Sequence, residues 1–253
     1  MSERIQAYIR RTAAIGRDTE RIGPFLATYS SHDANPFANY AVPDTGARPT
    51  PADVAALVDA YERRDRVPRL EYLPAVAPAV EAVLLAGGFT VEARPPLMTC
   101  REPAEAPVPA GFDLIEPVTD SDLRGLLSAQ HEAFGDTTPP TGEMLDKQSR
   151  MIAAGMLAAY ARDAATGEPA GGGVCTTISD GVGELAGIGV REKYRRRGIA
   201  AAITAYLTGA AFRAGATELF LTPGGEGAER IYGRAGFRAT DEVLFMSRRV
   251  ASS

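Results

Sequence analysis

The alternation of hydrophobic and polar positions predicts the elements in the C-terminal part of the chain. Residues 112–117 alternate in the manner of a strand, and polar residues from Thr119 onward offer an N-cap to a helix whose apolar positions continue to Phe134. The elements expected after these are a helix over 141–154, strands over 156–161, 172–179 and 183–190, a helix over 199–214, a strand over 219–222, a helix over 228–234 and a strand over 243–248. Strands and helices in this order predict an α/β fold with a mixed sheet.

A proline-rich segment divides the chain. Residues 101–111 contain three prolines and two glutamates, a composition that favours an extended connector over the interior of a helix or strand. We therefore expect an N-terminal region over residues 1–104, a linker over 105–111 and a domain over 112–253.

The two parts of the chain share a weak internal repeat. At a constant offset of 148 residues, the matches include Val42 with Val190, Gly88-Phe89 with Gly236-Phe237, and Leu97-Met98 with Phe245-Met246. We interpret the N-terminal part as a degenerate copy of the second half of the C-terminal domain. The alternative is that any two units built as strand, helix, Gly-Phe and strand look alike.

Composition and charge argue against several classes of protein. The net charge of −5 disfavours a surface that binds nucleic acid. No apolar run approaches the roughly 20 residues that a membrane span needs, and the charged N-terminal segment does not resemble a signal peptide. Cys100 and Cys175 lack metal-ligand spacing and are expected to be free thiols. We therefore expect a cytoplasmic protein without a metal and without nucleic-acid or membrane partners.

The segment between the strand over 183–190 and the helix over 199–214 carries the clearest chemistry. The first N–H groups of a helix have no acceptor within the helix and lie at the positive end of its dipole, so they bind phosphate where side chains leave room. Gly198 and Ala200 are small at the point of approach, and the arginines at 195–197 add positive charge. This segment therefore predicts a site for a pyrophosphate group.

With these motifs the chain resembles the GNAT superfamily of N-acetyltransferases. The family's loop pattern Gln/Arg-x-x-Gly-x-Gly/Ala is similar to Arg195-x-x-Gly198-x-Ala200, and its Leu-Tyr-x-x-x-Gly-Phe signature is similar to the segment from Ile231-Tyr232 to Gly236-Phe237. The resemblance covers about residues 112–249. It implies the acyl-CoA N-acyltransferase fold, a mixed and mostly antiparallel sheet flanked by helices, in a tandem arrangement with a vestigial N-terminal half.

The resemblance also implies an activity. Acetyl-CoA, as a co-substrate, would give its acetyl group to an amine of a small molecule or peptide by direct attack in a ternary complex. Glu184 would be the base, its pKa raised by partial burial, and Tyr232 the acid; the alternatives are a structural carboxylate and an aromatic packing residue. The residues implied at the cofactor are Ile188, Gly189, Val190, Arg195, Arg196, Arg197, Gly198, Ile199, Ala200 and Ala201.

Two features qualify this interpretation. Many family members carry an asparagine where this chain has Gly225, so one side-chain contact to the cofactor is lost. In the N-terminal half, the counterpart of the loop is the segment over 47–52, which has two prolines and no glycine. Because proline lacks an amide donor, we expect one cofactor site, in the C-terminal domain.

Other functions stay open at this point. A non-catalytic acyl-CoA-binding module would keep the loop without the chemistry, and another CoA-thioester enzyme, such as an acyl-CoA decarboxylase, could use the same fold. The acidic composition weakly favours a cationic acceptor. The N-terminal half could close the acceptor pocket, complete a sheet or form a contact in a homodimer.

Overall fold

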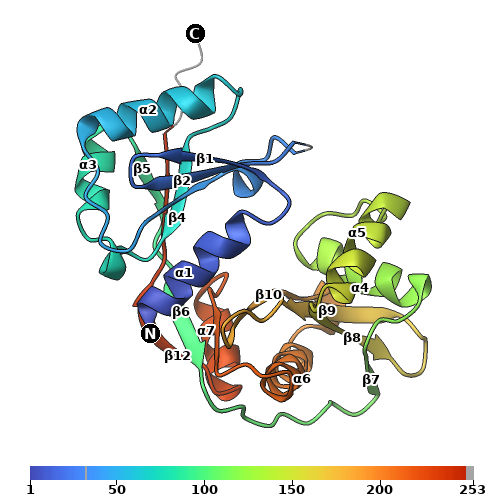
Figure 1. The fold of residues 1–253 in the computed structure, drawn as a ribbon. Helices are drawn as coiled ribbons and strands as arrows, with labels where there is room; N and C mark the ends of the chain where they lie inside the picture. Colours follow the sequence, from blue (N-terminus) through green and yellow to red (C-terminus); the bar gives the residue numbers. More distant parts are fainter. Residues whose placement is uncertain (32, 249–253) are drawn as a thin grey trace. The chain divides into compact units, whose positions relative to one another are not determined.

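The computed structural model describes residues 1–31 and 33–248 (Figure 1). The chain forms two compact units, one of Met1–Leu97 with Ala239–Ser253 and one of Met98–Arg238. It enters the second unit within strand β6 (Pro96–Cys100) and leaves it within strand β12 (Arg238–Glu242). The first unit therefore combines the N-terminal segment with the last strand that the structure describes, β13 (Leu244–Ser247).

The first unit is built on a six-stranded sheet in the order β1-β2-β3-β4-β13-β5. Its strands are β1 (Asp18–Ile22), β2 (Phe25–Tyr29), β3 (Ala41–Pro43), β4 (Arg69–Tyr72), β5 (Thr90–Ala93) and β13 (Leu244–Ser247), and its helices are α1 (Ser2–Ala13), α2 (Pro51–Glu62), α3 (Val80–Ala86) and the short 3-10 helices η1 (Pro36–Ala38) and η2 (Pro74–Val76). Strands β3 and β4 run parallel, and the other pairs described are antiparallel.

The second unit is built on a seven-stranded sheet in the order β12-β6-β11-β10-β9-β8-β7. Its elements are β7 (Phe112–Ile115), α4 (Asp120–Ala133), α5 (Gly142–Ala153), β8 (Leu157–Asp163), β9 (Pro169–Cys175), β10 (Val182–Val190), the 3-10 helix η3 (Glu192–Tyr194), α6 (Ile199–Arg213), β11 (Glu218–Leu221) and α7 (Glu226–Arg234). Strands β10 and β11 run parallel, whereas the pairs from β7 to β10 and β6 with β11 are antiparallel. The expected mixed, mostly antiparallel sheet flanked by helices is confirmed.

Each sheet contains the last strand of the other repeat. The offset of 148 residues that relates Pro51 at the start of α2 to Ile199 at the start of α6 also relates β5 to β12 and β6 to β13. In the first unit, β13 lies between β4 and β5; in the second unit, β6 lies between β11 and β12. The repeat is therefore structural, and the two copies exchange their final strands.

This exchange differs from what the sequence led us to expect for residues 243–248. They form a strand as expected, but β13 pairs with β4 and β5 of the first unit rather than with the sheet of the C-terminal domain. Strands pair through backbone groups that every residue carries, so the local sequence encodes the strand and leaves its partner open.

Local signals in the sequence account for several boundaries. Thr119 caps α4 in a capping box: its hydroxyl accepts from the backbone N–H of Asp122 at 3.2 Å, and the Asp122 carboxylate accepts from the N–H of Thr119 at 3.0 Å. Between β9 and β10, Asp180 and Gly181 both have positive φ, 50° and 73°, which suits a tight turn.

Helices α4 and α6 cover opposite faces of the second sheet (Figure 1). On one face, Ala186 of β10 packs with Leu126 of α4; on the other, Leu185 packs with Ile203 and Leu207 of α6. Because successive side chains of a strand point to opposite faces, Glu184 lies on the same face as Ala186, the face that α4 covers.

Three further findings concern the residues that the structure describes. None of their helices combines the length and the apolar character needed to cross a membrane. No group of three or more His, Cys, Asp or Glu side chains among them could hold a metal ion. Cys100 and Cys175 are both buried and free, and burial raises the pKa of the Cys175 thiol to about 12.

Candidate functional site

Strands β10 and β11 separate after three paired positions. Val182, Gly183 and Glu184 lie opposite Glu218, Leu219 and Phe220. Strand β10 then continues to Val190 without a partner in β11, whose last residue is Leu221. Backbone groups on this side of residues 185–190 therefore have no neighbouring strand and can face a ligand.

A bulge bends β10 within this stretch. The register against β9 shifts between Ala186 and Gly189, and Gly187 has a φ of 60°. The side-chain amide of Gln130 in α4 donates to the carbonyl oxygen of Gly187 at 2.8 Å. At Gly189 an added Cβ would lie 2.7 Å from the Cβ of Ala133, so only glycine allows α4 to approach this closely. Helix α4 thus holds the bulge in place.

The loop between β10 and α6 presents a row of backbone donors. Arg196 and Gly198 have positive φ, 61° and 84°, and the first helical bond of α6 runs from the N–H of Ala202 to the carbonyl oxygen of Gly198 at 3.1 Å. In the part of the chain that the structure describes, none of the N–H groups of residues 196–201 donates to a backbone carbonyl. These groups lie at the positive end of α6 and are placed to bind phosphate oxygens.

The loop and the end of β10 open on one pocket of ≈ 630 Å³. All the residues expected at the cofactor line it except Arg197, and Tyr232 lines it as well. The pocket is also lined by Phe134, the C-cap residue of α4, and by residues of α7, among them Ala228 and Arg234. Its size falls in the range of small-molecule and cofactor pockets.

Arg197 points to an aromatic cluster instead of the pocket. Its guanidinium lies 4.5 Å from the ring centroid of Phe112 and 5.9 Å from that of Tyr194. These are distances at which a cation is attracted to the face of an aromatic ring. The side chain of Arg197 therefore anchors the loop to β7.

The other two arginines of the loop differ from Arg197 and from each other. Arg195 donates to the carbonyl oxygen of Val190 at 3.1 Å and to that of Ala133 at 3.2 Å, so it ties the end of β10 to the end of α4. Arg196 is exposed and lines the pocket.

Tyr232 is buried in the wall of the pocket, with 9% of its surface exposed. Its ring meets that of Phe237 edge-on, with centroids 6.4 Å apart. Burial raises the pKa of the phenol, so the hydroxyl keeps its proton at neutral pH. Within the described residues this hydroxyl makes no hydrogen bond, which leaves its proton available to a ligand.

Glu184 lies at the last paired position of β10 and β11, where the two strands separate. Thr176 of the segment after β9 fixes its backbone: the N–H of Thr176 donates to the carbonyl oxygen of Glu184 at 2.8 Å, and the N–H of Glu184 donates to the Thr176 hydroxyl at 3.0 Å. Glu184 is not part of the pocket wall around Tyr232. Its role as a base stays a prediction, as do the roles of the other site residues.

Sequence reasoning missed the residues that α4 contributes. Gln130 and Phe134 carry no local motif, and they reach the bulge and the pocket because α4 packs on β9 and β10. Arg234 lies inside the variable part of the Tyr-x-x-x-Gly-Phe signature, so its spacing from Tyr232 was the one signal that could have found it.

A bulged strand that separates from a parallel neighbour, followed by a phosphate-binding loop and helix, defines the fold of the acyl-CoA N-acyltransferases. Residues 123–237 match the model of the acetyltransferase (GNAT) family. The match covers most of the second unit, which therefore contains a GNAT domain. A search of curated proteins found no match.

Solved structures extend the likeness to both units. A GCN5-related N-acetyltransferase from Kribbella flavida is 27% identical, with a TM-score of 0.82 over 99% of this chain and 96% of that chain. One from Sphaerobacter thermophilus is 19% identical, with a TM-score of 0.66 over 89% and 80%. A tandem GNAT protein from the clavulanic acid biosynthesis pathway is 15% identical, with a TM-score of 0.67 over 100% and 88%. The expected tandem GNAT fold is thereby confirmed.

Proposed function

We propose that this chain transfers an acetyl group from acetyl-CoA to an amine of a small molecule or peptide, by direct attack in a ternary complex. One observation carries the proposal: the unbonded N–H groups of residues 196–201 open on the same pocket as the unbonded hydroxyl of Tyr232. One ligand could thus place its pyrophosphate at these amides and its leaving thiolate beside Tyr232, the acid that would protonate it.

The pocket offers a place for each part of acetyl-CoA. The pyrophosphate would accept from the amides of residues 196–201, with Arg196 beside it. The pantetheine would lie along residues 188–190, where β10 has no partner in β11. A backbone N–H directed at the thioester oxygen would stabilise the negative charge that develops there by about 3 kcal/mol.

The chemistry then needs one base and one acid. Glu184 would take a proton from the attacking amine, directly or through a water molecule, and Tyr232 would give its proton to the departing sulfur. The raised pKa of Tyr232 supports its role, because the phenol carries the proton that the sulfur needs.

The first unit lacks the features that a second cofactor site would need. Its helix α2 starts with Pro51, which has no N–H, and Thr50 and Asp53 form a capping box at the same end. The Asp53 carboxylate accepts from the N–H of Thr50 at 2.7 Å, so a negative charge already lies where a phosphate would bind. This unit would not hold acetyl-CoA.

Binding and turnover can be tested separately. Calorimetric titration with CoA tests the pocket, and thiol release from acetyl-CoA in the presence of a panel of amines tests the reaction. Turnover that requires an amine is the expected result. CoA binding without turnover would favour a non-catalytic module, thioester loss without an amine would favour another CoA enzyme, and no CoA binding would refute the proposal.

The setting of the reaction is also a proposal. Two buried free thiols suit a reducing compartment, so we place the protein in the cytoplasm. The formal charge of −5 favours a cationic acceptor. A homodimer stays an open alternative to a single chain.

A further inference from the structure

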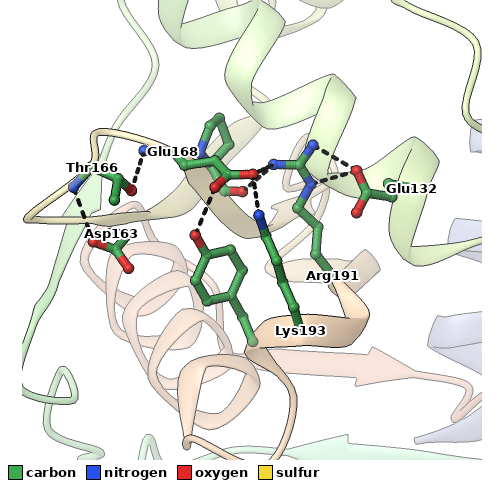
Figure 2. A network of polar contacts seen from close by, with 8 residues as sticks. Glu132, Asp163, Thr166, Glu168, Arg191 and Lys193 are labelled. Atoms are coloured by element: carbon green, nitrogen blue, oxygen red, sulfur yellow. Dashed lines mark hydrogen bonds and ion pairs between the residues drawn. The ribbon is translucent and has the colours of Figure 1, made fainter.

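The turn between β8 and β9 carries a carboxylate that faces the cofactor loop (Figure 2). Asp163 orders this turn by accepting from the N–H groups of Ala165 and Thr166 at 3.0 and 3.1 Å. The Thr166 hydroxyl in turn accepts from the N–H of Glu168 at 3.3 Å. Glu168 therefore projects from a defined backbone.

Glu168 contacts three side chains of the segment that leads into the loop. Its Oε1 accepts from Arg191 at 3.1 Å and from Lys193 at 2.5 Å, and its Oε2 accepts from the hydroxyl of Tyr194 at 3.0 Å. Tyr194 lies directly before Arg195 and its ring lines the pocket. The same carboxylate thus fixes the pocket wall and the entry to the loop.

Arg191 extends this network to α4. Figure 2 shows its guanidinium between two carboxylates. It meets Glu132 of α4 at 2.8 Å through Nε and at 2.6 Å through Nη2, and its Nη1 also donates to the carbonyl oxygen of Pro169 at 2.8 Å. Its side chain is 15% exposed. The network therefore joins α4, the turn and the end of β10.

The network is charged at neutral pH. A hydrogen bond from Lys193 lowers the pKa of Glu168 most, and one from Tyr194 lowers it further. The hydrogen bond to Glu168 in turn raises the pKa of Lys193. Two cations, Arg191 and Lys193, meet two carboxylates, Glu168 and Glu132, so their charges are balanced before the loop begins. The basic groups left for a phosphate are those of the loop.

We propose that Glu168 is a positioning residue for the cofactor loop: it holds Arg191, Lys193 and Tyr194 so that the amides of residues 196–201 face the pocket before the ligand arrives. The inference rests on the proposed acyl-CoA site and deepens it. Such fastening matters because Arg196 and Gly198 have left-handed backbones and adjacent amide dipoles repel one another. A loop held in its binding conformation loses less entropy when the pyrophosphate binds.

The first unit contains a matched tie, in which one carboxylate again meets two cations. Asp44, after β3, forms ion pairs with Arg21 of β1 and with Arg10 of α1. No row of unbonded amides like that of residues 196–201 follows it, because the capping box of Thr50 occupies the start of α2. Removing Asp44 therefore changes charge and local structure to a similar extent without touching a cofactor loop.

The test compares Glu168→Gln with Asp44→Asn in the full chain. Calorimetry with CoA should give about fivefold weaker binding for Glu168→Gln and unchanged binding for Asp44→Asn. Pantetheine, which lacks the pyrophosphate, should bind both variants as it binds the unchanged protein, measured by NMR titration. Glu168→Asp, which keeps the charge, should recover part of the loss.

Three results would overturn the inference. CoA could bind Glu168→Gln as tightly as before or more tightly, which would mean that the carboxylate only opposes the phosphate charge. CoA and pantetheine could weaken together, which would mean a general structural role. If Glu168→Gln does not fold, Tyr194→Phe removes one contact alone, and unchanged CoA binding would then count against the inference. Failure of the unchanged protein to bind CoA would instead refute the proposed function.

Discussion

Met98 of β6 lies opposite Leu221 of β11 in the sheet of the second unit. Its counterpart in the repeat, Met246 of β13, lies opposite Leu70 of β4 in the sheet of the first unit. Both methionines are buried, with 4% and 0% of their surface exposed. The stability of each unit therefore depends on a residue from the other repeat.

Met246→Ala and Met98→Ala should weaken opposite units. Truncating a buried methionine costs roughly 2–5 kcal/mol. Amide hydrogen exchange should quicken in β4 for Met246→Ala and in β11 for Met98→Ala, because these strands lose a packed neighbour. If Met246→Ala exposes β11 before β4, the assignment of the exchanged strands is wrong.

Gly198→Ala should weaken CoA binding about tenfold, or about 1.4 kcal/mol. The φ of 84° places Gly198 in the left-handed region, and an added Cβ would lie 3.4 Å from Pro109. A non-glycine residue there costs about 1–2 kcal/mol, and the loop can relieve this strain only by turning its amides.

Gly215→Ala is the matched control for this change. Gly215 follows the other end of α6 with a φ of 97°, and an added Cβ would meet no atom within 4 Å. It should lower thermal stability to a similar extent and leave CoA affinity, measured by calorimetry, unchanged. Equal effects of both variants on CoA affinity would contradict a specific role of the loop.

Tyr232→Phe should lower kcat by roughly 10²-fold while CoA affinity stays nearly constant. The variant keeps the ring that packs on Phe237 and loses only the hydroxyl. Because the pKa of Tyr232 is raised, the phenol keeps its proton as the pH rises past the ordinary value for tyrosine. Loss of this proton should therefore cause no decrease in the rate of the unchanged enzyme at any pH below about 10. Steady-state kinetics from pH 6 to pH 10 check both points; an unchanged kcat would exclude Tyr232 as the acid.

Glu184→Gln should also lower kcat by roughly 10²-fold. A glutamine keeps the shape of the side chain but cannot accept the proton of the amine, so the acid limb of the pH–rate profile should disappear. CoA affinity and the thermal midpoint are the controls. A variant that loses stability and keeps its rate would assign Glu184 to the structure of the sheet.

Asp122→Asn should destabilise the protein by about 1 kcal/mol at neutral pH. Hydrogen bonds from Thr119 lower the pKa of Asp122 to about 2, so folding favours the ionised carboxylate. Its contribution is complete above about pH 4 and is lost as the pH falls towards 2. The difference in Tm between the unchanged protein and the variant should therefore shrink over this interval. Asp120→Asn, in the same turn but outside the capping box, is the control.

The sequence alone determined the loop before Ile199, for which we propose phosphate binding, and most element types, because their causes are local. A helix that starts at Ile199 after Gly198 presents unbonded amides in any fold that leaves its end open. The repeat was visible for a related reason: Gly88-Phe89 and Gly236-Phe237 follow equivalent helices.

Only the tertiary structure decided which segments meet. Strand β12 was missed because its residues, Arg238–Glu242, are polar and mostly exposed, and it is a strand through pairing with β6. Three features join residues far apart in the chain: the exchange of β6 and β13, the hydrogen bond from Gln130 to the bulge, and the contacts of Glu168. Backbone pairing and single side-chain contacts over such separations leave no periodic trace in one sequence, so they could be seen only once the chain was folded.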